Sequence, residues 1–294
     1  MAKLTLPEWL AELYPFAHHF FPVDQNLQLH YVDEGEPQAE AVVMLHGNPT
    51  WSFYYRHLIR YLSPYYRCLA LDHMGCGLSD KPQTYPYCLN QHIDNALRWL
   101  EHLALKSFHL VVHDWGGAIG MGIATQCPEK IRSLTILNSA GFLSKRMPYR
   151  IAFCRTCFGA WSITHLNSFA QAATVMASVH PLHKNVKHGY LYPYRTVADR
   201  IAIQAFVQDI PMNPQHPSYA LLESIQNRLP LLSNKPCLLA WGMKDFCFNS
   251  HFLMQWKTYF PNAQVQCYDT AGHYVLEDAR SRVNQAILTF LQQQ

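Results

Sequence analysis

Three residues that could supply a nucleophile and move protons each stand shortly after an apolar run of the sequence. Asp114 lies between one such run and the pair Gly116 and Gly117, Asp245 follows a second run, and His273 follows the last. A carboxylate can act as a nucleophile, and an imidazole is the side chain that most often transfers protons. Their shared position after apolar runs makes Asp114 a candidate nucleophile, Asp245 a candidate acid and His273 a candidate base.

Each of these residues also has a purely structural interpretation. Asp is a favoured N-cap, so Asp114 could simply begin a helix. The chain contains 17 histidines, and a single histidine usually has a structural role. Small glycines after Asp114 would nevertheless let a strand turn sharply into a helix and hold the carboxylate at the sheet edge. The three positions together favour the catalytic interpretation.

The elements that must position these residues are short β-branched or leucine-rich runs separated by helix-length stretches. The middle five runs are continuously apolar, as in strands that are buried on both faces. Alternation of such strands with helices predicts an α/β fold with a mostly parallel sheet. The expected strands are 27–32, 41–45, 67–71, 108–112, 133–137, 237–241 and 263–267, and the expected helices include 89–103 and 118–127.

The alternation stops after residue 140. The segment 141–231 contains helical stretches and proline-containing loops but no convincing buried strand, and a structureless loop of this length is implausible. We therefore expect a helical cap at 141–231, inserted in a core formed by 1–140 and 232–294. Residues 156–183 lack charged side chains but carry too many polar groups for a transmembrane helix. Four cap aromatics are expected to give an apolar pocket, although each could simply pack: Phe153, Phe158, Trp161 and Phe169.

Composition narrows the classes of function. Hydrophobic residues make up 49% of the 294, charged residues 15%, and the net charge of +3 gives no reason to expect nucleic-acid binding. Nine scattered cysteines without a secretory segment predict a cytoplasmic protein. Cys154 and Cys157 form a lone C-x-x-C pair, which we interpret as two buried thiols rather than a metal site. No cofactor is expected. The amphipathic start at 7–13 could touch a membrane or a partner enzyme, or pack on the core.

Four motifs make the whole chain resemble the α/β-hydrolase superfamily and, within it, the haloalkane dehalogenase branch. The resemblance implies a mostly parallel twisted sheet flanked by helices with an inserted helical cap. The nucleophile, acid, histidine order is that of this fold, in which the loop at 46–49 and the residue after the nucleophile supply the backbone N–H groups of an anion hole. The motifs are HGNPTWSFYYR at 46–56, HDWGG at 113–117, WGMKD at 241–245 and AGH at 271–273.

The dehalogenase resemblance implies roles for five residues. Asp114 matches the nucleophile, His273 the base and Asp245 its orienting acid. Asn48 and Trp115 match the two side-chain donors that hold a leaving halide. Epoxide hydrolases usually carry an aromatic residue in place of Asn48 and so fit less well. Some dehalogenases carry the orienting acid where this chain has Asn138. An amide cannot replace a carboxylate in that role, so Asp245 is favoured as the acid. The glycine-containing segment 72–80 is a signature of the fold and is given no chemistry.

A finer resemblance lies in the cap. The segments 192–195, 206–211 and 216–218, together with 51–56, resemble the β-lactone decarboxylases of bacterial long-chain olefin biosynthesis. This implies an apolar alkyl substrate, with ring opening by Asp114 and loss of CO2, and a possible assembly with other lipid-pathway enzymes. The alternative is hydrolytic halide release through an alkyl ester. A non-catalytic member of the fold is disfavoured by the five retained residues, and a serine-type esterase by Asp at position 114.

Overall fold

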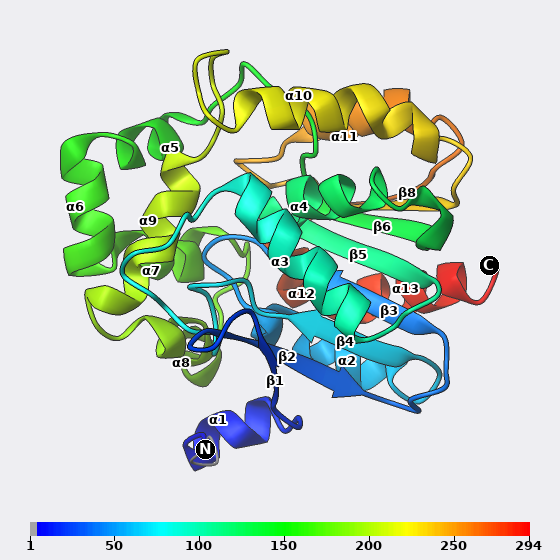
Figure 1. Ribbon diagram of the computed structural model, residues 1–294, viewed down its shortest axis with the longest axis horizontal. Helices are drawn as coiled ribbons and strands as arrows, with labels where there is room; N and C mark the ends of the chain where they lie inside the picture. Colours follow the sequence, from blue (N-terminus) through cyan, green and yellow to red (C-terminus); the bar gives the residue numbers. More distant parts are fainter. Residues whose placement is uncertain (1–4) are drawn as a thin grey trace.

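A computed structural model describes residues 5–294 and contains one continuous β-sheet (Figure 1). Its strands lie in the order β1-β2-β4-β3-β5-β6-β7-β8. β1 and β2 are antiparallel to their neighbours, and every pair from β4–β3 to β7–β8 is parallel. The strands are β1 (His19–Pro22), β2 (Gln28–Glu34), β3 (Ala41–Leu45), β4 (Arg67–Leu71), β5 (Phe108–Asp114), β6 (Ile131–Ser139), β7 (Cys237–Gly242) and β8 (Gln264–Tyr268).

The central strands are buried on both faces, as their continuous apolar runs predict. In β3, Val43 and Leu45 pack into one apolar layer while Val42 and Met44 pack into the layer on the opposite face. This alternation follows from the two-residue period of a strand, whose successive side chains point to opposite faces. Every residue of β3, β5 and β7 is buried. The sheet is therefore the middle of three layers.

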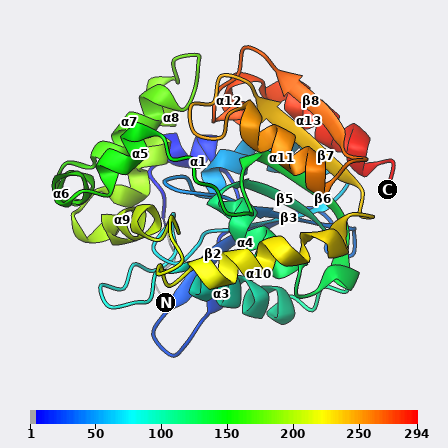
Figure 2. The same ribbon diagram turned by 90° about the horizontal axis from the view of Figure 1, so that it is seen from above.

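Helices form the other two layers. One face is covered by α3, α4, α10 and α11, and the other by α2, α12 and α13 (Figures 1 and 2). The α-helices are α1 (Glu8–Leu13), α2 (Arg56–Leu62), α3 (Leu89–His102), α4 (Trp115–Ala124), α5 (Tyr149–Cys154), α6 (Cys157–Leu166), α7 (Ser168–Met176), α8 (Lys184–Leu191), α9 (Ile201–Gln208), α10 (Tyr219–Arg228), α11 (Ser250–Tyr259), α12 (Val275–Asp278) and α13 (Arg280–Leu291). The 3₁₀ helices are η1 (Ser52–Tyr55), η2 (Pro128–Lys130), η3 (Tyr192–Tyr194), η4 (Ala198–Arg200) and η5 (Leu229–Leu232).

Residues 141–231 form helices joined by loops and contain no strand. Helices α5 to α9 lie together beyond the carboxyl ends of the parallel strands, on the left in Figure 1. α10 instead returns to the sheet, where Leu222 and Ile225 join the apolar layer that includes α3 and α4. The division into a cap at 141–231 and a two-part core stays a prediction, because α10 packs with the core layer.

Two elements lie outside the sequence-based expectation. β1 is short and lies at the sheet edge, and α2 directly follows the aromatic motif at 51–56. The amphipathic start forms α1, which packs on the protein: Leu10 is buried and the Trp9 ring lies 6.1 Å from His188 of α8. No helix within residues 5–294 has the length and apolar character needed to cross a membrane.

Candidate active site

Asp114 stands at the turn from β5 into α4, as predicted. Its backbone has φ 51° and ψ −124°, a conformation that residues other than glycine rarely adopt. The surrounding structure must therefore hold Asp114 in this conformation. Gly116 allows the close approach of α4 to β3, because a Cβ there would collide with the Leu45 carbonyl. A strained backbone conformation that tight packing maintains is typical of functional sites.

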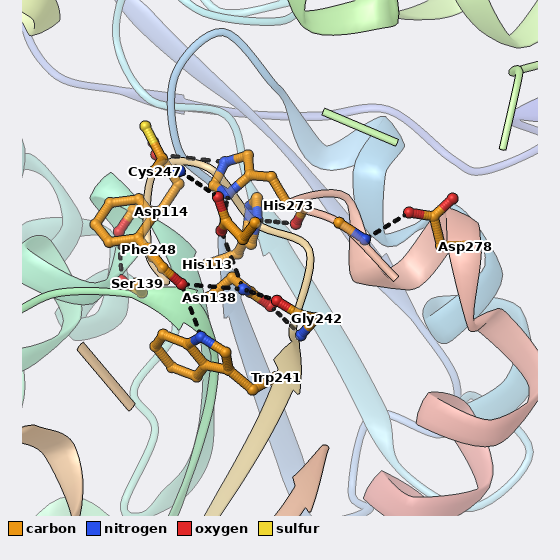
Figure 3. A network of polar contacts seen from close by, with 12 residues as sticks. His113, Asp114, Asn138, Ser139, Trp241, Gly242, Cys247, Phe248, His273 and Asp278 are labelled. Atoms are coloured by element: carbon orange, nitrogen blue, oxygen red, sulfur yellow. Dashed lines mark hydrogen bonds and ion pairs between the residues drawn. The ribbon is translucent and has the colours of Figure 1, made fainter. Parts of the chain in front are cut away.

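His273 lies beside Asp114 (Figure 3), and Asp245 contacts the same imidazole. His273 Nδ1 is 2.8 Å from Asp245 Oδ2, and His273 Nε2 is 3.5 Å from Asp114 Oδ2. Asp245 follows β7, and His273 lies between β8 and α12. The imidazole therefore bridges two carboxylates, one on each ring nitrogen. The structure brings together the three residues that the sequence singled out.

Two supporting residues were not identified as such from the sequence. Asn138, at the end of β6, accepts a hydrogen bond from the Gly242 N–H at 2.7 Å and donates to Asp245 Oδ2 at 3.0 Å. His113 Nε2 is 2.9 Å from the carbonyl oxygen of His273, and its ring stacks on Tyr54 at 4.3 Å. Asn138 thus fixes the acid and His113 fixes the histidine loop. Their nearness to the motifs was the only available signal.

The predicted anion-binding residues also reach Asp114. The backbone N–H of Asn48 donates to Asp114 Oδ1 at 2.7 Å, and its side-chain amide donates to the Ile203 carbonyl of cap helix α9 at 3.0 Å. An amide carries two hydrogens, so one of them remains for a ligand. The indole N–H of Trp115 has no hydrogen-bond partner within residues 5–294, and its ring lies 5.3 Å from Phe206. Both side chains can therefore donate to an anion next to Asp114.

The charges of the site are strongly coupled. Burial by itself would raise the pKa of Asp114, but the hydrogen bond and charge of His273 hold that pKa below its usual range. Burial would likewise lower the pKa of His273, but Asp245 and Asp114 raise it to about 10. At neutral pH the resting site therefore holds an Asp114 carboxylate against a His273 imidazolium.

A cavity of about 580 Å³ lies over these groups and is lined mainly by apolar side chains of the cap and core. This volume is in the range of sites for small molecules. Asn48, Asp114, Trp115 and His273 contribute to its wall. A carboxylate nucleophile thus faces an apolar space with a few converging polar groups.

Two of the four cap aromatics expected in the pocket are elsewhere. Phe153 and Phe169 line the cavity, but Phe158 and Trp161 do not, and both are exposed on α6. The expectation was wrong for these two because the α6 aromatics turn away from the sheet. The expectation of buried thiols was also wrong for Cys157, which is exposed, whereas Cys154 is half-buried at the cavity.

The segment 72–80 has the structural role that was expected. Asp72 is fully buried and accepts hydrogen bonds from the backbone N–H groups of Ser52 and Leu78 at 2.7 and 2.9 Å. Its Oδ2 is 2.8 Å from His30 Nδ1. These contacts hold the loops after β3 and β4 together, away from the cavity wall.

Known proteins are similar to this chain in fold and in sequence. The family described as alpha/beta hydrolase fold matches residues 40–279. A cis-3-alkyl-4-alkyloxetan-2-one decarboxylase of Shewanella oneidensis is 42% identical, covering 96% of this chain and 90% of its own. Haloalkane dehalogenase 2 of Mycobacterium tuberculosis is 30% identical, with 94% and 96% covered. The crystal structure of the haloalkane dehalogenase DatA from Agrobacterium tumefaciens superposes with a TM-score of 0.85 at 26% identity, covering 94% and 96%. The chain belongs to the α/β-hydrolase fold family.

Proposed function

We propose that this protein is a decarboxylase of dialkyl β-lactones, converting a cis-3,4-dialkyl oxetan-2-one to an olefin and CO2. The observation that carries the proposal is the 42% identity, over nearly the whole chain, with an enzyme of that name. The apolar cavity above Asp114 supports it, because such a substrate consists of two alkyl chains around one small polar ring. The proposed catalytic residues are Asp114, His273 and Asp245, with Asn48 and Trp115 as anion-binding residues.

In the first proposed step, a carboxylate oxygen of Asp114 attacks ring carbon C4. The C4–O bond of the lactone breaks, and its electron pair stays on the ring oxygen, which becomes part of a free carboxylate. Asp114 is then esterified to C4. The Asn48 amide and the Trp115 indole can donate hydrogen bonds to the new carboxylate, as they would to any leaving anion. Release of ring strain drives this opening.

In the second step, the bond between C3 and the new carboxylate breaks and CO2 leaves. The electron pair of that bond forms the C3–C4 double bond, and the C4–O bond to Asp114 breaks, which restores the Asp114 carboxylate. Attack with inversion at C4, followed by anti elimination, converts a cis lactone to a cis olefin. No water is consumed and no proton is transferred overall.

This route gives His273 a role that needs no proton transfer. As an imidazolium held by Asp245, it stabilises the Asp114 carboxylate both before attack and as it departs from C4. Asn138 supports the arrangement by donating to Asp245. A buried cation beside the leaving carboxylate favours elimination in a cavity whose apolar walls limit access of water.

The second candidate is haloalkane dehalogenation, which the 30% identity with haloalkane dehalogenase 2 favours. Here halide leaves from an alkyl carbon, and water must hydrolyse the Asp114 ester. Esterification removes the charge of Asp114, one of the groups that raise the pKa of His273. The imidazole can then lose its proton and act as a base toward water. The same residues thus support either reaction, and the substrate decides between them.

The experiment is a parallel assay of the purified protein with a dialkyl β-lactone and with a 1-bromoalkane. Olefin and CO2 are followed in the first reaction and bromide in the second. The proposal predicts that olefin forms much faster than bromide across a range of lactone lengths. Bromide release that outruns olefin formation at every length would assign the chain to the dehalogenases instead. Assembly with other lipid-pathway enzymes stays a prediction.

A further inference from the structure

The outer side of the cap carries an exposed apolar surface. It consists of Tyr149 and Phe153 of α5 and Phe158, Trp161 and Leu166 of α6, and is called the cap patch below. Tyr149 is 75% exposed and Phe158 63%. The Phe158 ring lies 6.1 Å from Phe153 and 5.8 Å from Trp161, so the aromatics form a continuous surface. A contiguous exposed patch of large apolar side chains marks an interaction site.

The cap patch adjoins the proposed active site. Helix α6 is the outermost helix of the cap, at the far left of Figure 1. Tyr149 and Phe153 belong to the patch and also line the cavity above Asp114. An apolar surface therefore runs from the outside of the cap to the cavity wall. A molecule bound to the patch would therefore lie next to the wall of the cavity.

The charge around the cap patch is of one sign. Residues 130–198 contain no Asp or Glu, and the cap at 141–231 has nine Lys and Arg against three acidic residues. Lys145, Arg146 and Arg150 are exposed beside the patch, and Arg146 and Arg150 also line the cavity. Of the three cap acids, Asp209 is buried. The chain outside the cap has the opposite net charge, so the positive charge is concentrated on this side of the molecule.

We propose that the cap patch docks on an anionic lipid bilayer and that the apolar substrate enters the cavity from that bilayer. Tyr and Trp side chains are suited to the interface between lipid tails and water, and flanking Lys and Arg are attracted to anionic headgroups. α5 and α6 have 6 and 10 residues and would lie in the interface without crossing it. Only the entry of substrate rests on the proposed function.

Vesicle flotation of the full chain tests the docking. The probes are vesicles of phosphatidylcholine alone and of phosphatidylcholine with phosphatidylglycerol. We expect binding to the second kind only, weakened by salt. The variant Phe158→Ser/Trp161→Ser, neither of which lines the cavity, should bind at least about tenfold more weakly, and so should Lys145→Glu. Matched controls on α11, Met254→Ser at an apolar position that is 58% exposed and Lys257→Glu, should bind like the wild type.

Three results would overturn the proposal: no binding to anionic vesicles, equal loss of binding in the α11 controls, or equal binding to uncharged vesicles. Light scattering of the same variants gives a further check. The cap patch is instead an interface with a second copy if the wild type self-associates without binding vesicles and Phe158→Ser/Trp161→Ser abolishes that self-association. The docking readout needs no turnover, so failure to form olefin would refute the proposed reaction and leave the vesicle result standing.

Discussion

The side-chain amide of Asn138 donates to Oδ2 of Asp245 over 3.0 Å, and that same oxygen is 2.8 Å from His273 Nδ1. One carboxylate oxygen is thus shared between the histidine and an amide on the neighbouring strand. Asn138 also accepts from the Gly242 N–H, so its side chain ties β6 to the end of β7. Asn138 therefore acts as a support for Asp245.

Replacing Asn138 with Ala should therefore damage both the fold and the proposed site. The buried Gly242 N–H loses its partner, which should lower the free energy of unfolding by about 1–3 kcal/mol. We also expect kcat to fall about tenfold, because Asp245 is less firmly held. Denaturant unfolding and steady-state kinetics measure the two effects. Asn26→Ala, at an exposed position, is the control, and a kcat equal to that of wild type in Asn138→Ala would contradict this role.

The pKa of His273 should be measurable near 10 by NMR titration of its ring. A folded-state pKa above the ordinary 6.5 means that the imidazolium stabilises the native protein. That contribution is complete at low pH, below about 6.5, and is lost as the pH rises through about 10. Asp245→Asn and Asp114→Asn should each lower the pKa of His273, with the larger change in Asp245→Asn. A wild-type titration near 6.5 would refute the coupling between these groups.

How much of this arrangement could be predicted from the sequence depends on the range of the interactions. The buried strands and the Asp114 turn are local features, since apolar runs and glycine spacing predict them. The supporting role of Asn138 was not foreseen because it depends on the neighbouring strand β7, which is distant in sequence. Phe158 and Trp161 were placed in the pocket because composition shows that a segment is apolar without showing which way α6 faces. β1 has only four residues and ends in a proline, a residue disfavoured within strands, so it could not be recognised.

Removing the histidine should separate ester formation from ester hydrolysis. In His273→Gln, a bromoalkane that reacts with Asp114 should leave an alkyl ester that water cannot remove. Mass spectrometry of the peptide containing Asp114 should then show an increase equal to the alkyl group. The double variant Asp114→Asn/His273→Gln serves as the control and should show none. Binding of the bromoalkane without any adduct in His273→Gln would argue against Asp114 as a nucleophile.

The apolar cavity should make turnover depend on the length of the substrate chains. Burial of a methylene contributes about 0.8 kcal/mol, so kcat/KM should rise about fourfold for each added CH2 until the cavity of about 580 Å³ is filled. A series of dialkyl β-lactones of increasing length, assayed for olefin, measures this. Independence of chain length over the whole series would show that the alkyl chains do not occupy the cavity.

The fate of oxygen during turnover tests the central claim most directly. The protein is incubated with a dialkyl β-lactone in water enriched in the heavy oxygen isotope, and the Asp114 peptide is then analysed by mass spectrometry. Decarboxylation through an Asp114 ester that breaks at C4 predicts olefin and CO2 with no isotope entering Asp114. Asp114→Asn, prepared fresh and shown to be folded, should form no olefin. Heavy oxygen in Asp114 after turnover of the lactone, or olefin formation by Asp114→Asn, would contradict the account.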